Sequence, residues 1–235
     1  MIRCKYLIAV ILIMLLAVPS IAKKVKTASN KDNILTDLRY HYTMDILKNW
    51  KIKTFKEKEE KPEVLRALLI QKNYRVNKEA KNLDADFTRP EIQIFARKDN
   101  ITIEEFAELL KTDVKAHNSK DEIINQLNLL LSGEYIDMQT IEFGGEKAAQ
   151  MFFKRRWERI LQGDPEDPRY RHSGGRIVRD VIDVQEIYIL NHNGNLIVIQ
   201  ACSEFEFYDT LKNEIFNIVS SIEFKEAVSL ETDNK

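Results

Sequence analysis

The sequence predicts a mixed fold of helices and strands in which an antiparallel sheet is covered on both faces. The segment EIYILNHNGNLIVIQA places Asn193-Gly194 between two apolar, β-branched runs, which is a strong local signal for a β-hairpin. Apolar residues occupy odd and even positions of its second arm alike, over 196–199. Because a strand that is apolar on both sides needs cover on both sides, we expect a layer on each face of the sheet.

Three segments are predicted to form the covering helices. Thr102, followed three positions later by Glu105, gives a capping box at the start of the first helix. A second helix is expected over Ser119–Leu131, capped by its first residue and stopped by Gly133. Near the C-terminus, apolar residues recur at helical spacing over 211–222 and predict a third helix with one apolar stripe.

The other strands are predicted from alternating polarity or from short apolar runs. They follow one another at 40–46, 50–54, 65–70, 90–100 and 134–157, and the last of these is a hairpin with a Gly-Gly turn. In the second strand of this hairpin the odd positions from Ala149 to Trp157 share one face.

Residues 1–22 have the pattern of a secretory signal peptide: a short positive start, an apolar run over 6–18, and Ser20-Ile21-Ala22 at the cleavage position. The alternative is an uncleaved anchor, although the apolar run is shorter than the roughly 18 residues that a spanning helix prefers. Cleavage would leave Cys202 without a partner cysteine, so we expect stability from packing alone. The protein is therefore expected to be exported, to the periplasm or the extracellular space.

The expected organisation is a signal peptide at 1–22, a linker at 23–38, one domain at 39–227 and a polar tail at 228–235. The mature chain would carry 34 basic and 37 acidic residues, so bulk charge does not favour nucleic acid as a partner. No second apolar run is long enough to span a membrane, so no span is expected after signal cleavage.

The order of the predicted elements resembles the PsbP-like superfamily, named for the extrinsic protein of photosystem II. The resemblance runs from Arg39 to Phe224 and rests on YTMDILKNWKI, PEIQIFARKDNITIEEFAELL, EFGGEKAAQMFF, the Asn-Gly hairpin and a last helix ending in SSIEF. It implies an α/β/α sandwich, with an antiparallel sheet between helices, and a role in binding or scaffolding without a shared catalytic apparatus. The Pro-x-Gly-Trp turn of the family reads Leu47-Lys48-Asn49-Trp50 here.

The loop QGDPEDPRYRHSGGR (162–176) is the first candidate site, because about thirteen residues is long for a connection in a compact domain. Four of its side chains could converge on a phosphate or carboxylate, since guanidinium groups bind such anions in pairs. These residues are Arg169, Arg171, His172 and Arg176. The alternative is a solvated hairpin tip whose arginines pair with the acids of the loop. The spacing fits neither a P-loop nor a metal motif, so no metal or cofactor is expected.

The strand before this loop gives the second candidate, which consists of Arg155, Trp157 and Arg159. Arg155 falls on the apolar face, where a charge must be paired or must reach solvent. One interpretation is an arginine that extends its head group to water at the edge of the core. The other is a binding cleft in which guanidinium groups lie against the Trp157 ring.

These features predict an exported, non-catalytic binding or accessory module whose surface is formed by the loop and the preceding strand end. Its partner would be a protein or a small anionic ligand. The alternatives are a periplasmic hydrolase with a site assembled by the fold, and a purely structural envelope protein. The chain has no G-x-S-x-G sequence and no other catalytic motif that would favour an enzyme.

Overall fold

A seven-stranded antiparallel sheet with the order β5-β7-β8-β12-β11-β10-β9 forms the centre of the protein. The computed structural model describes residues 24–25, 27–55, 57–58, 63–72, 89–162, 166–169 and 173–225. The strands of the sheet are β5 Trp50–Thr54, β7 Leu65–Gln71, β8 Glu91–Lys98, β9 Gly133–Phe143, β10 Glu146–Gln162, β11 Arg176–His192 and β12 Asn195–Glu204. Every residue of β12 is buried, which confirms the expected cover on both faces.

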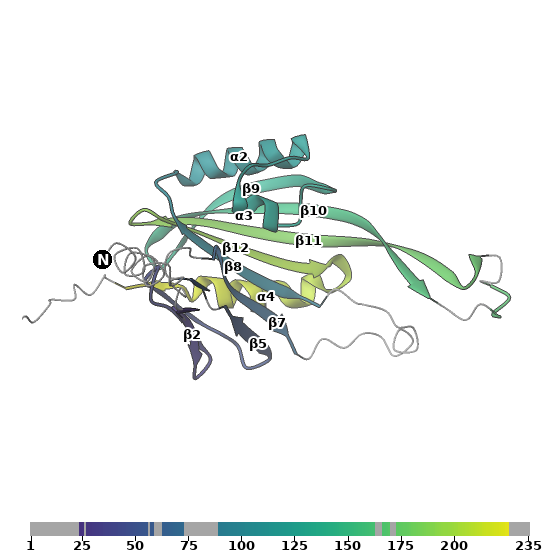
Figure 1. The fold of residues 1–235 in the computed structure, drawn as a ribbon, viewed down its shortest axis with the longest axis horizontal. Coiled ribbons are helices and arrows are strands. Elements are labelled where there is room, and N and C mark those ends of the chain that lie inside the picture. Colours follow the sequence, from purple (N-terminus) through teal and green to yellow (C-terminus); the bar gives the residue numbers. More distant parts are fainter. Residues whose placement is uncertain are drawn as a thin grey trace, which may run out of the picture.

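One face of the sheet is covered by α2 (Ile103–Ala116) and α3 (Glu122–Gln126) (Figure 1). Phe106 and Leu110 of α2 pack with Phe153 of β10 and Val198 of β12 in one apolar cluster. The buried residues Phe106, Leu110 and Val114 lie on one side of α2, because residues three and four apart share a face.

The other face is covered by α4 (Phe205–Ser220) and by a second, four-stranded sheet with the order β13-β4-β3-β2. Its strands are β2 Ala28–Lys31, β3 Ile34–Asp37, β4 Tyr42–Asp45 and β13 Glu223–Phe224, and the short strands β1 Lys24–Val25 and β6 Glu57–Lys58 pair separately. Ile215 and Ile218 of α4 pack with Tyr188 and Ile199 of the central sheet. The predicted fold, an antiparallel sheet between helices, is thereby confirmed.

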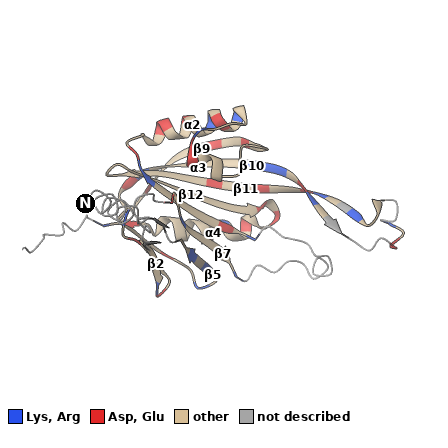
Figure 2. Cartoon of the chain, in the orientation of Figure 1, with Lys and Arg blue, Asp and Glu red and all other residues tan. Residues whose placement is uncertain are grey.

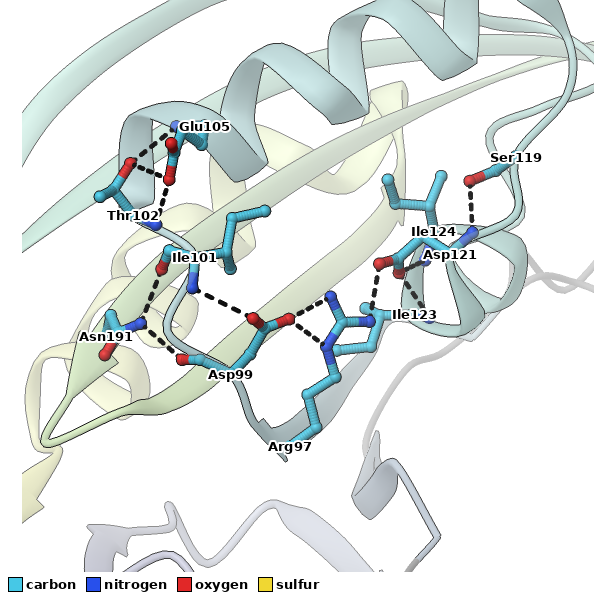
Figure 3. Close-up of polar contacts among 10 residues, drawn as sticks. All are labelled: Arg97, Asp99, Ile101, Thr102, Glu105, Ser119, Asp121, Ile123, Ile124 and Asn191. Carbon is cyan, nitrogen blue, oxygen red and sulfur yellow. Dashed lines mark hydrogen bonds and ion pairs between the residues drawn. The ribbon is translucent and has the colours of Figure 1, made fainter.

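Polar contacts fix the start of α2 against the sheet (Figure 3). The capping box is present: the Thr102 hydroxyl accepts from the Glu105 backbone N–H, and the Glu105 carboxylate accepts from the Thr102 backbone N–H. Asn191 of β11 donates to the backbone carbonyls of Asp99 and Ile101, at 3.0 and 2.7 Å. Arg97 contacts Asp99 and also reaches the carboxylate that caps α3. The turn between β8 and α2 is therefore tied to β11 and α3.

The expected linker at 23–38 is wrong, because β2 and β3 lie within it and form half of the small sheet. Asp32 and Asn33 connect the two strands with φ of 54° and 62°, the conformation of a type I′ hairpin turn. At the end of β3, the fully buried Asp37 carboxylate accepts from Arg66 Nε of β7 at 2.7 Å. This buried ion pair attaches the segment to the central sheet.

The second predicted helix is shorter than expected. Asp121 rather than Ser119 caps it, with its carboxylate accepting from the backbone N–H groups of residues 123 and 124. The helix ends at Gln126, because Asn128 takes the left-handed conformation with φ of 55° before Gly133 is reached.

Two expected segments lie outside the described part of the chain, the signal peptide at 1–22 and the polar tail at 228–235. Within the residues that the structure describes, no helix is both long enough and apolar enough to cross a membrane.

Candidate functional site

The hairpin of β10 and β11 extends beyond the rest of the sheet (Figure 1). Pairing of β9 with β10 ends at Gly133 and Arg155, and pairing of β12 with β11 ends at Glu204 and Asp183. Beyond these points, residues 156–162 and 176–182 pair only with each other among the described residues. We call this two-stranded ribbon the arm; at the usual rise per residue it is about 20 Å long.

A buried carboxylate lies at the foot of the arm, which is the end where Arg155 and Asp183 join the arm to the rest of the sheet. Asp183 is fully buried, and its Oδ2 accepts from Arg155 Nε at 3.2 Å, from Arg155 Nη2 at 2.5 Å and from Trp157 Nε1 at 2.8 Å. Burial raises the pKa of Asp183, although the hydrogen bonds from Arg155 and Trp157 act in the opposite direction. The two predicted residues on β10 therefore share one acceptor on β11.

A second buried ion pair lies next to it, between Arg159 and Glu204 at the end of β12. The guanidinium carbons of Arg155 and Arg159 lie 5.7 and 4.9 Å from the centre of the Trp157 ring, one on each side along the strand. Val181, opposite Trp157 in the register, is also buried. The structure thus brings Arg155, Trp157 and Arg159 together, and they fix the first part of the arm to the sheet.

A hollow of about 510 Å³ opens beside this foot, where β9 begins. Arg155, Arg156 and Trp157 line it from β10, and the segment that leads into β9 lines it with Asn128, Leu131 and Ser132. Leu131 is 88% exposed, although leucine is usually buried. Arg156 is also exposed and forms no ion pair with a described residue. The hollow therefore combines apolar surface with one available positive charge.

The outer part of the arm has an exposed apolar pair on one face. Ile160 and Val178 are directly opposite each other in the register and are 56% and 50% exposed. Figure 2 shows basic residues along the projecting part of the hairpin, and the exposed arginines there are Arg156, Arg176 and Arg179. The acids on the same ribbon, Glu158 and Asp180, lie opposite each other.

Two of the other predicted residues, Arg169 and Arg176, are described at the far end of the hairpin. Arg169 donates to the neighbouring Asp167 through Nε at 3.1 Å and Nη2 at 2.6 Å, and this pairing lowers the pKa of Asp167 to about 2. Arg176 forms the last pair of the two strands with Gln162. Gln162 lies about 17 Å along β10 from Trp157. The structure therefore separates Arg176 from the foot, while Arg171 and His172 lie outside the described residues.

Sequence reasoning missed the acids that complete the foot, Asp183 and Glu204, and it missed Leu131. The signal for Asp183 is a carboxylate within the apolar, β-branched segment VIDV (181–184), where a buried carboxylate requires a partner. The pairing itself depends on the register between three strands, which local sequence does not specify.

Two further polar features lie inside the sheet. On the α4 side, the buried Glu186 carboxylate accepts from the hydroxyl groups of Tyr188 and Tyr208 and from Gln150 Nε2, so its oxygens have partners on three elements. On the α3 side, burial raises the pKa of the Cys202 thiol. A buried, protonated thiol is unreactive, as expected for cysteine used as a small apolar side chain.

The chain matches no protein-family model and no curated protein. Similar solved structures include a cyanobacterial PsbP from Synechocystis, with 10% identity, a TM-score of 0.48 and coverage of 86% of this chain and 94% of that one. LpqN, involved in cell envelope biogenesis of Mycobacterium tuberculosis, has 12% identity, a TM-score of 0.41 and coverage of 86% and 91%. A Bacteroides thetaiotaomicron protein has 10% identity, a TM-score of 0.35 and coverage of 87% of this chain and 49% of that one. A PsbP protein, the family that the sequence resembles, is thus among these structures, and the likeness concerns the fold.

Proposed function

We propose that this protein is an exported, non-catalytic accessory module of the cell envelope that binds a protein partner through the arm and its foot. The observation that carries the proposal is the arm itself, a ribbon that leaves the sheet and exposes an apolar pair, Ile160 and Val178. A two-stranded hairpin is at best marginally stable alone in water. An element of this kind, anchored by buried ion pairs at its foot, is suited to docking.

A protein partner is favoured over a small anionic ligand because three of the predicted binding arginines already have acidic neighbours. Arg155 pairs with Asp183, and Arg159 pairs with Glu204. Arg169 likewise pairs with an acid of its own loop. Their charges are therefore largely neutralised, whereas the exposed apolar pair offers surface that only another macromolecule would cover.

Within this proposal the predicted binding residues have two roles. Arg155 and Arg159 set the direction of the arm, and Trp157 supplies the aromatic wall of the hollow. Arg169 and Arg176 would contact the partner from the end of the ribbon, and Arg171 and His172 of the same loop sequence are proposed to bind the partner as well. The partner is expected to be acidic around an apolar patch, to complement the arm.

The test is to capture partner proteins from the native envelope with the wild type and with a variant whose arm is shortened. Asn-Gly replaces residues 160–178 and joins Arg159 to Arg179, which are opposite each other in the register, so the foot is kept. The matched control is Phe216→Ser on α4, because Phe216 is 45% exposed but lies on the body. Unfolding curves confirm that both variants fold.

The proposal expects a protein that is captured by the wild type and by the Phe216→Ser variant but is lost from the shortened-arm variant. Retention of that protein by the folded shortened-arm variant contradicts the proposal. So does the absence of any captured protein in the wild-type sample.

A further inference from the structure

We infer that the partner contributes an extended, acidic segment that adds as a strand to the free edge of β10, in line with β9, and fills the hollow at the foot with one apolar side chain. The inference rests on the proposed function and specifies the partner chemistry of the same site. It depends on three features of the arm: its open edge, its charge and the hollow.

The edge is open because β9 stops pairing before β10 does. The last pair is Gly133 with Arg155, and β10 continues to Gln162. Over 156–162, the side of β10 that faces away from β11 has no neighbouring strand among the described residues. Backbone N–H and C=O groups along such an edge are available for another strand, which is how extended peptides add to sheets.

The charge of β9 indicates which kind of strand this edge accepts. β9 contains three acidic residues and no basic residue, whereas residues 154–162 of β10 contain four basic residues and one acidic residue. Arg155 and Arg159 already pair with Asp183 and Glu204, so Lys154 and Arg156 are the basic residues left to a strand on this side. Glu134 of β9 is opposite Lys154, and Glu142 is opposite Lys147. Opposite charges across neighbouring strands stabilise the pairing. A strand that continues the line of β9 past Arg155 therefore meets the same preference for an acidic residue at Arg156.

The hollow lies where such a strand would begin. Its apolar walls are Leu131 and Trp157, and Arg156 also lines it. An apolar side chain of the segment would cover Leu131, and a neighbouring carboxylate would reach the Arg156 guanidinium. This arrangement explains why Leu131 is almost fully exposed in the segment that leads into β9.

The direct test uses a short, end-blocked probe peptide that alternates valine and glutamate around a central leucine, together with a counterpart in which lysine replaces glutamate. Binding to the full protein is followed by fluorescence, since Trp157 borders the hollow and the other tryptophan, Trp50, is buried. We expect the acidic peptide to bind at least tenfold more tightly than the basic one, and to protect backbone amides within 156–162 from hydrogen exchange. Equal binding of the two peptides, or no protection, overturns the inference.

Two matched pairs of variants locate the contact. Arg156→Glu should weaken binding of the acidic peptide at least tenfold, whereas Arg179→Glu, an exposed arginine on β11, should change it less than threefold. Leu131→Ser should weaken binding, whereas Leu38→Ser, at another exposed leucine, should not. Equal effects within either pair overturn the inference.

The captured partner separates failure of this inference from failure of the proposed function. Loss of that partner with the shortened arm but full binding by the Arg156→Glu and Leu131→Ser variants overturns the strand addition alone. Retention by the shortened-arm variant overturns both. A dimer of this chain that Arg156→Glu dissociates would make the occupant a second copy, which also contradicts the inference.

Discussion

Removal of the Asp183 carboxylate should destabilise the fold strongly, because three hydrogen-bond donors share it. Loss of one partner from a buried ion pair costs about 3–5 kcal/mol. Since the Arg155 side chain keeps 13% exposure and can reach some water, Asp183→Ala is expected at the lower end, about 3 kcal/mol. For a domain of this size that loss lowers Tm by about 6–12 °C.

Urea unfolding curves and thermal melts measure this loss, with Asp180→Ala as the control. Asp180 is exposed on the same strand, so its removal should change the free energy of unfolding by less than about 0.5 kcal/mol. The double variant Arg155→Met with Asp183→Leu should lose less than Asp183→Ala, because no unpaired charge stays buried. If Asp183→Ala is within about 1 kcal/mol of the wild type, the carboxylate does not hold the foot as described.

The same group gives a pH dependence with a defined sign. Burial raises the pKa of Asp183 above its ordinary value of 3.8, so the folded state favours the protonated carboxyl. The resulting stabilisation is fully present below pH 3.8 and is lost as the pH rises through the folded-state pKa. As the pH rises over that interval, the free energy of unfolding of the wild type should therefore fall relative to that of Asp183→Asn. A relative rise in stability over the same interval contradicts a raised pKa for Asp183.

Three further predictions concern single positions. Gly144→Ala should cost more than Gly145→Ala in unfolding experiments, because both have positive φ but only at Gly144 would a Cβ meet a backbone carbonyl oxygen, at 2.7 Å. Thr102→Ala should cost about 1 kcal/mol through loss of the α2 cap, and an unchanged stability contradicts the capping role. Titration by NMR should give Asp167 a pKa of about 2, and the Arg169→Gln variant should bring that pKa back toward 3.8. Because the pKa is lowered, the stability that the Asp167 carboxylate contributes is lost as the pH falls through about 2.

Local signals predicted much of the fold. The Thr102–Glu105 capping box and the Asn193-Gly194 turn depend on neighbours within a few residues, and both are present. The β2–β3 hairpin was missed because its turn is Asp32-Asn33, a weaker signal than Asn-Gly, in a polar context. The early end of α3 was missed because the left-handed conformation falls on an asparagine rather than on the later glycine.

The candidate site was predictable only in part. A period of two places Arg155 and Trp157 on one face of a strand, and the structure agrees. Their acceptor Asp183 is 28 positions from Arg155 in the chain, and the Arg159 partner Glu204 is 45 positions away. Contacts of that kind depend on strand register and on the twist of the hairpin, so the structure was needed to distinguish structural arginines from exposed ones.

The central claim, that the arm is the binding surface, is tested most directly by site-specific photo-cross-linking in the native envelope. A photoreactive residue replaces Ile160 on the arm in one variant and Phe216 on α4 in another, since both side chains are about half exposed. The account predicts one cross-linked protein species from Ile160, lost when Arg156→Glu is added, and no such species from Phe216. No cross-link from Ile160, or the same species from both positions, would contradict it.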